Sequence, residues 1–187
     1  TTYLYLYHLD ISQNSIYYMQ ERSFSKIKPL KKLNVSHNKI TLLKSRTFDS
    51  LQRLNELCLN NNPISLIEAG LFIGLGNLRS LSIAHSQLLA VYPESFKGLS
   101  YLMALDLSYS RLQCMPTEIF HIFRSLRELY LKGNTLALPN YETVQKLLSL
   151  DILSTDDARW CCLMYSIRKC TPAPHTSLQC SPILHTR

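Results

Sequence analysis

The sequence predicts an α/β solenoid in the shape of a horseshoe, with a parallel β-sheet along its concave side. The first observation is that leucines recur every 24 residues, each followed by the alternating L-x-L spacing of a short, half-buried strand. A unit of that size cannot bury its apolar side alone, so successive units must stack and share one core. The second observation is that four of the six cysteines lie in the last 27 residues, which predicts a disulfide-stapled C-terminal cap.

Several further positions keep the same 24-residue register. The leading column holds Leu6, Leu30, Leu54, Leu78, Leu102, Leu126 and Leu150, and an aromatic column holds Phe24, Phe48, Phe72, Phe96 and Phe120. A turn column holds Asn14, Asn38, Asn62, Ser86, Ser110 and Asn134. An asparagine amide can satisfy backbone groups of the adjoining turn, and serine can do less of this, so the fourth and fifth repeats are expected to be weaker.

The pattern L-x-x-L-x-L-x-x-N-x-L resembles the leucine-rich repeat and extends over roughly 150 of the 187 residues. Residues 1–149 are expected to form six such repeats. Residues 150–187 are expected to form a degenerate last repeat and a cysteine-rich cap or hinge. The leucine, isoleucine and phenylalanine columns are interpreted as core, with the phenylalanines packing as a spine beneath the convex side.

Binding by a solenoid of this kind is expected on the solvent-facing positions of the concave sheet, which the register divides into four columns. Seven strands about 4.8 Å apart make a sheet roughly 29 Å across, which suits a peptide or protein ligand better than a metabolite. The candidate site lies toward its C-terminal end and comprises Asp106, Tyr109, Glu128, Tyr130, Asp156 and Asp157. Tyrosines among carboxylates can hold a basic side chain of a partner. The alternative is an ordinary solvated face.

Positive charge is concentrated at the N-terminal end. Residues 1–50 hold eight basic and three acidic side chains, and the rest of the chain carries a net charge of only +2. The basic residues are Arg22, Lys26, Lys28, Lys31, Lys32, Lys39, Lys44 and Arg46. This N-terminal basic edge can bind a polyanion such as a glycosaminoglycan, or it is simply a solvated edge. Nucleic acid is not expected, because aromatic stacking platforms and a groove-entering helix are lacking.

The sequence Asn34-Val35-Ser36 matches the acceptor pattern for N-glycosylation, on a concave strand. The cysteines Cys161, Cys162, Cys170 and Cys180 favour two disulfides over a metal site, since the short paired spacings of zinc ligands are absent. Two pairings remain open, 161–170 with 162–180 or 161–180 with 162–170, and both imply an oxidising compartment. Cys58 and Cys114 are expected to be unpaired.

The segment from Trp160 to Pro172 reads W-C-C-L-M-Y-S-I-R-K-C-T-P and resembles the cap of leucine-rich-repeat-containing G-protein-coupled receptors. The spacing C-x8-C-x-P matches the relaxin-receptor-like branch, and an adjacent cysteine pair occurs across the glycoprotein-hormone-receptor group. Cys180 fits the next cysteine of the hinge in that group.

This resemblance implies the hormone-binding ectodomain of a plasma-membrane receptor. The hinge would pass binding of a peptide or protein hormone to transmembrane helices of the same parent chain, and a G protein would be reached only through that membrane part. In the relaxin branch concave acidic residues receive basic residues of the hormone, and Asp106, Glu128 and Asp156 stand at comparable positions.

Other classes of function are expected less. The main alternative is a secreted or single-span leucine-rich-repeat protein of adhesion or pattern recognition, and a cytosolic scaffold would require free thiols. An enzyme is not expected, because the chain has no phosphate loop and no G-x-S-x-G elbow. No cofactor is expected either. The chain starts at Thr1 without an initiator methionine, so we interpret it as a piece of a longer protein.

Overall fold

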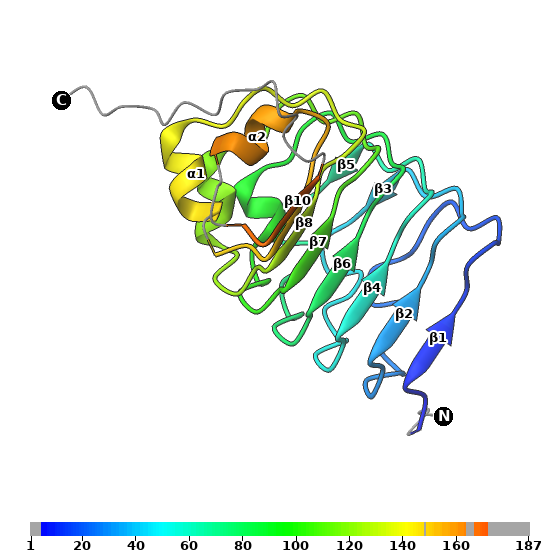
Figure 1. Cartoon of the computed structure of the whole chain (residues 1–187). Helices are drawn as coiled ribbons and strands as arrows, with labels where there is room; N and C mark the ends of the chain where they lie inside the picture. The colour runs from blue at the N-terminus through cyan, green and yellow to red at the C-terminus, as the bar shows by residue number, and fades with distance from the viewer. Residues whose placement is uncertain (1–4, 148, 164–166, 172–187) are drawn as a thin grey trace.

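A computed structural model of the chain describes residues 5–147, 149–163 and 167–171. These residues form a stack of turns in which short strands lie side by side along one face, and two helices cover the C-terminal end (Figure 1). This is the α/β solenoid with a parallel sheet that the 24-residue register predicts, so the fold prediction is confirmed.

The main sheet is parallel throughout and follows the order of the chain, apart from two short strands that lie elsewhere. Its strands are β1 (His8–Asp10), β2 (Lys32–Asn34), β4 (Glu56–Cys58), β6 (Ser80–Ser82), β7 (Ala104–Asp106), β8 (Glu128–Tyr130), β9 (Ile152–Ser154) and β10 (Lys169–Thr171). Seven strands were predicted and eight are found. The additional strand, β10, comes from the cap and pairs with β9, so the cap closes the sheet edge that the last repeat would leave open.

The remaining elements lie off the main sheet. A second sheet consists of β3 (Leu42–Leu43) and β5 (Leu66–Ile67), and two 3-10 helices follow, η1 (Pro93–Phe96) and η2 (Thr117–His121). The α-helices are α1 (Tyr141–Leu147) and α2 (Ala158–Leu163). Helix α1 starts after Asn140, whose Oδ1 accepts a hydrogen bond from the backbone N of Thr143 at 2.8 Å.

The core consists of the leucine, isoleucine and phenylalanine columns that the 24-residue register predicts, and they form one continuous cluster. The leading leucines from Leu30 to Leu150 are buried. The phenylalanines form the predicted spine: ring centroids lie 5.8 Å apart in the Phe24–Phe48 and Phe72–Phe96 pairs. Phe123, which lies outside the column, packs edge-on against Phe96 at 5.5 Å. Stacked repeats therefore share one core, as their spacing requires.

The turn asparagines bond the backbone as predicted. The side-chain amide of Asn62 donates to the carbonyls of Val35 and Leu59 at 3.0 and 2.9 Å, and its Oδ1 accepts from the backbone N of Ile40 at 3.1 Å. In the next two repeats Ser86 and Ser110 are joined through their hydroxyls at 2.9 Å. The Ser110 hydroxyl also lies 3.1 Å from the carbonyls of Ile83 and Ser108. A hydroxyl has one proton to donate where an amide has two, and the lower stability of those repeats stays a prediction.

The cap is tied down by a disulfide between Cys161 in α2 and Cys170 in β10, with 5.6 Å between the two Cα atoms. This bond belongs to the first of the two predicted pairings. The side chain of Cys162 and all of Cys180 lie outside the described residues. Cys58 and Cys114 are free thiols, as expected. Within the described ranges no helix has the length and apolar character needed to cross a membrane.

Candidate ligand-binding face

The concave face exposes two side chains from each three-residue strand, because the middle residue points into the core. The first and third residues of the strands therefore make up the first two predicted columns. Register pairs such as His8↔Lys32 and Asp106↔Tyr130 align each column from strand to strand. The third and fourth predicted columns lie beyond the strand ends, which corrects the expectation of four columns on the sheet. Residues of the fourth column adopt positive φ angles at the turn: Gln13, His37, Asn61, His85, Tyr109 and Gly133.

Three of the six candidate residues come together on neighbouring strands. Asp106 of β7 stands in register with Tyr130 of β8, and Glu128 lies two residues before Tyr130 on the same face. The phenol of Tyr130 donates to Glu128 Oε2 at 3.0 Å. Burial raises the pKa of Tyr130, and the Glu128 and Asp106 carboxylates raise it further, because they disfavour a phenolate. We name Asp106, Glu128 and Tyr130 the acidic cluster, since two carboxylates and a phenol share this part of the sheet.

Serine hydroxyls hold the carboxylate of Asp106 in place. Its Oδ1 accepts from the backbone N and the hydroxyl of Ser108 at 3.0 and 2.6 Å. Its Oδ2 lies 3.1 Å from the hydroxyl of Ser82, which in turn lies 2.6 Å from Asn60 Oδ1. A charged group that is already oriented loses little entropy when a ligand binds, so Asp106 is prepared to receive a cation.

Tyr109 lies beside the cluster and is 45% exposed. Its ring stacks on the imidazole of His85, with 4.6 Å between centroids and 7° between planes. A Cβ at position 133 would overlap the Tyr109 ring, so the turn there requires Gly133. The stacked rings of His85 and Tyr109 offer an aromatic surface just beyond the C-terminal ends of β6 and β7.

The last two candidates lie in the cap, and their carboxylates are engaged by other residues of the chain. Asp156 Oδ2 accepts from the backbone N atoms of Gly133 and Asn134 at 2.6 and 3.1 Å. Asp157 starts helix α2 and forms an ion pair with Arg159 at 2.6 Å. The Arg159 hydrogen bonds hold the pKa of Asp157 below its usual value. Both carboxylates thus order the cap, and a role for them in binding a ligand stays a prediction.

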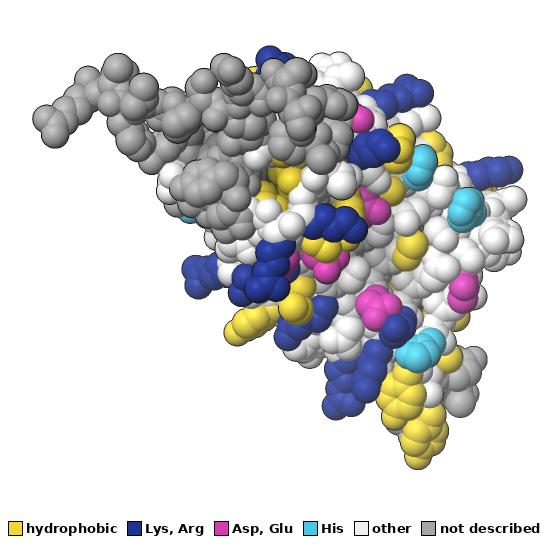
Figure 2. All heavy atoms as spheres, in the orientation of Figure 1, with side chains coloured by type: hydrophobic (Ala, Val, Ile, Leu, Met, Phe, Trp, Pro, Cys, Tyr) yellow, Lys and Arg dark blue, Asp and Glu magenta, His cyan; other side chains and the backbone are white. Residues whose placement is uncertain are grey.

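A second candidate surface lies in the N-terminal half of the concave sheet, where no ligand-binding site was predicted from the sequence. A hollow of ≈ 470 Å³ extends across β1, β2, β4 and β6. On its floor Lys32 and Glu56 form an ion pair at 2.7 Å across adjacent strands, and Asn34 donates to Asp10 Oδ2 at 3.1 Å. Opposite charges at one register position, Lys32 and Glu56, are the sequence signal that could have found this pair. Figure 2 shows how acidic, basic and histidine side chains alternate over this face. Glycosylation of Asn34 stays a prediction.

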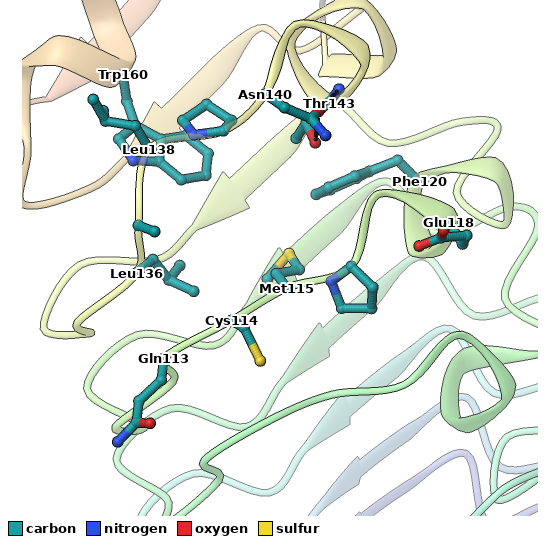
Figure 3. Close-up of a pocket in the computed structure, with 13 residues that line it drawn as sticks. Gln113, Cys114, Met115, Glu118, Phe120, Leu136, Leu138, Asn140, Thr143 and Trp160 are labelled. Atoms are coloured by element: carbon teal, nitrogen blue, oxygen red, sulfur yellow. Dashed lines mark hydrogen bonds between the residues drawn. The ribbon is translucent and has the colours of Figure 1, made fainter.

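Another hollow, of ≈ 360 Å³, lies off the concave sheet between the last repeats and the cap. Figure 3 shows Trp160 and Leu138 on one side of it and Met115 and Phe120 on the other. Its lining is mainly apolar, and it contains none of the predicted site residues. In the described ranges no three His, Cys, Asp or Glu side chains gather closely enough to hold a metal ion.

Comparison with known proteins agrees with this geometry. The sequence model of the family described as "Leucine rich repeat" matches residues 5–64, 28–88 and 76–136. Among solved structures, the crystal structure of a TLR13–ssRNA13 complex superposes with a TM-score of 0.77 at 25% sequence identity. The match covers 87% of this chain and 24% of that chain, so this chain spans about a quarter of the TLR13 length. No curated protein sequence matches significantly.

Proposed function

This chain belongs to the leucine-rich-repeat family, and we propose that it is a ligand-recognition segment of an extracellular pattern-recognition or adhesion protein. The observation that carries this proposal is the continuous concave sheet of a solenoid that superposes on TLR13 in a ligand complex. The Cys161–Cys170 disulfide supports an oxidising, extracellular location. Leucine-rich-repeat solenoids typically bind rather than catalyse, which supports a non-enzymatic role.

The proposed ligand is a peptide or protein that presents a basic side chain. The carboxylates of Asp106 and Glu128 would receive that charge, and Tyr109 would pack against the apolar part of the same segment. The structure to which this chain is similar contains single-stranded RNA. Here the acidic cluster would repel a phosphate backbone, so the concave site favours a cationic ligand.

Charge reversal tests the concave site. Asp106→Arg with Glu128→Arg should weaken binding of basic peptides, selected from a display library on the full chain, by about a hundredfold. The matched control is Asp10→Arg with Glu56→Arg, which reverses the same two register positions in the N-terminal half. Binding would be measured by titration calorimetry and folding by thermal unfolding. Unaltered affinity in the first double variant, with loss in the second, would move the site to the hollow across β1 to β6.

A hormone-binding ectodomain of a G-protein-coupled receptor is the second candidate. The observation in its favour is the disulfide across the C-x8-C segment, at the place where the sequence resembles the cap of those receptors. The family and structural matches do not support that narrower class, and the likeness to TLR13 favours the first candidate. Sequencing the parent transcript beyond Arg187 separates them: seven apolar helices would support the second candidate, and one or none the first.

A further inference from the structure

A continuous row of residues directly precedes the strands of the main sheet. The backbone N of each member donates to the carbonyl of the member one repeat earlier: Lys31 to Tyr7, Asn55 to Lys31, Arg79 to Asn55, Met103 to Arg79, Arg127 to Met103 and Asp151 to Arg127, all at 2.7 or 2.8 Å. Successive members are therefore one strand spacing apart. Cations stand at every second position, Lys31, Arg79 and Arg127, at intervals of about 10 Å.

The two arginines of this row are held in the same way. Arg79 Nη1 donates to the carbonyl of Tyr101 at 3.3 Å, and Arg127 Nη1 donates to the carbonyl of Ser149 at 3.2 Å. Each guanidinium has five N–H donors and retains most of them for a ligand. Arg79 also lies over the Tyr101 ring at 5.2 Å from its centroid, and Lys31 lies over the Tyr7 ring at 5.5 Å. Both cations are thus pre-positioned by their own chain.

Lys28 and Arg53 come shortly before the row members Lys31 and Asn55 in the sequence, and together they line a hollow of ≈ 610 Å³. We name Lys28, Lys31, Arg53, Arg79 and Arg127 the strand-start edge. None of the five forms an ion pair with a described residue. Two acids lie nearby and are paired with other cations: Asp49, which lines the same hollow, lies 3.7 Å from Arg22, and Asp151, at the end of the row, lies 3.8 Å from Arg168. In the view of Figure 2 the strands start toward the lower left, and dark blue and yellow side chains lie side by side along that boundary.

This edge differs from the N-terminal basic edge that the charge count predicted. Of those eight residues Lys32 faces the concave side and pairs with Glu56, and Lys44 lies over the Tyr18 ring on another part of the molecule. Arg53, Arg79 and Arg127 come from the part of the sequence that appeared nearly neutral. Stacking of the repeats aligns Arg79 and Arg127 with Lys31, and it brings Arg53 to the same hollow as Lys28.

We propose that the strand-start edge binds a sulfated polysaccharide. Guanidinium groups pair with planar or tetrahedral oxyanions through paired, charge-assisted hydrogen bonds, and evenly spaced cations match a polymer with regularly repeated sulfate groups. A single-stranded nucleic acid would also need free aromatic faces for its bases. Lys31 and Arg79 already lie over the rings of Tyr7 and Tyr101, which favours the polysaccharide.

The test uses the full chain and immobilised heparin, with desulfated heparin and single-stranded RNA as competing probes. Arg79→Gln with Arg127→Gln should weaken heparin binding about tenfold or more, because two charge-assisted contacts are lost. The matched control is Lys39→Gln with Lys44→Gln, which removes the same charge away from this edge and should change binding less than threefold. Arg79→Lys with Arg127→Lys should give an intermediate loss, since the charge stays and the paired donors go.

Lys31→Gln with Arg53→Gln provides a second test, because neither side chain hydrogen-bonds a described backbone group and folding should be preserved. A loss of heparin affinity in this variant and a shallower dependence of affinity on salt would support the proposal. Equal losses in the Lys39/Lys44 control would show that net charge alone is responsible. Tighter binding of RNA than heparin, or equal binding of desulfated heparin, would also overturn the proposal.

Discussion

At the scale of single residues, the turn asparagines show how one side chain holds adjacent repeats together. Asn62 is fully buried, and its amide group bonds carbonyls on its own repeat and on the repeat before it. Without it the backbone N of Ile40 and the carbonyl of Leu59 would lose these hydrogen bonds, whereas the carbonyl of Val35 would keep its bond from the Asn38 amide at 2.9 Å. The residue is therefore required for backbone hydrogen bonding rather than for packing volume.

Removing the Asn62 amide should lower the stability of the protein substantially. Asn62→Ala should lower the free energy of unfolding by about 2 to 4 kcal/mol, because buried backbone groups lose their partners. Asn14→Ala is the matched control: Asn14 occupies the same column, donates to the carbonyls of Ile11 and Ser12, and is exposed, so its loss should cost less than about 1 kcal/mol. Urea unfolding of both variants measures the difference. Equal costs would show that burial of the amide is unimportant.

Tyr130 gives a pH-dependent test of the acidic cluster. Because burial and two carboxylates raise its pKa in the folded protein above the ordinary tyrosine value of about 10, the folded state holds the phenol proton more tightly than the unfolded state. This contribution to stability is present below pH 10 and is lost as pH rises through the folded pKa. Glu128→Gln should lower the pKa of Tyr130 toward its ordinary value, as followed by phenolate absorbance.

Tyr130→Phe is the control that identifies this titration. It should remove the phenol whose pKa the cluster raises, and should make the decline in stability above pH 10 less steep. An absorbance titration that is identical in Glu128→Gln and the unmodified protein would show that the carboxylate does not contact the phenol in solution.

At the scale of elements, two glycines at equivalent places let successive repeats approach closely. Gly74 and Gly98 have φ angles of +96° and +106°. A Cβ on Gly74 would lie 3.0 Å from the carbonyl oxygen of Asp49, and one on Gly98 would lie 2.7 Å from that of Phe72. Each glycine thus combines a left-handed backbone with contact against the previous turn, which no other residue tolerates well.

Substitution at Gly98 should therefore disturb the turn. Gly98→Ala should destabilise the protein by about 2 kcal/mol or more, since the backbone is strained and a backbone oxygen cannot move aside. Gly76→Ala is the matched control, because a Cβ there meets nothing within 4 Å; it should leave stability unchanged or raise it by about 0.5 kcal/mol. The melting temperatures of the two variants measure the difference in stability. Equal melting temperatures would contradict the close approach.

At the scale of the whole molecule, stability is distributed along one axis, because each repeat contacts its neighbours. Phe72 and Phe96 are fully buried and stack in the middle of the solenoid, whereas Phe24 lies near its N-terminal end. A defect in the middle therefore separates two halves, and a defect near the end shortens the ordered stack.

Truncating the spine should show this difference. Phe72→Ala should cost about 3 to 5 kcal/mol and should broaden the urea transition, because the two halves no longer unfold as one unit. Phe24→Ala should cost less and leave the slope of the transition nearly unchanged. A single sharp transition for Phe72→Ala, with the same slope as the unmodified chain, would show that coupling between halves does not depend on the spine.

Much of the fold could be predicted because every column of the register has a local reason. Leu9 and Leu33 alternate with polar neighbours, so they must face the core, and Asn38 follows where the chain turns. The cap could be predicted only in part. Nothing in Lys169–Thr171 resembles the earlier repeats, and it becomes a strand because β9 offers unpaired backbone groups.

The candidate site divides in the same way. Asp106, Glu128 and Tyr130 could be predicted as neighbours, because parallel strands in a constant register align equal positions. Asp156 stands at a comparable place in the sequence, but its carboxylate turns to the backbone N of Gly133. Hydrogen-bonding partners of that kind depend on the path of the adjacent turn, which the register does not specify.

The sequence alone determined the repeat length, the parallel sheet and the buried columns, because each follows from local spacing repeated many times. It also indicated a disulfide-stapled end, because four of the six cysteines lie in the last 27 residues. Only the tertiary structure decided which charges share a surface. Lys31, Arg79 and Arg127 are far apart in the chain, and stacking aligns them in one row, while Lys28 and Arg53 meet across one hollow. Electrostatic surfaces depend on distances in space, and a solenoid sets those distances by its strand spacing rather than by separation along the chain.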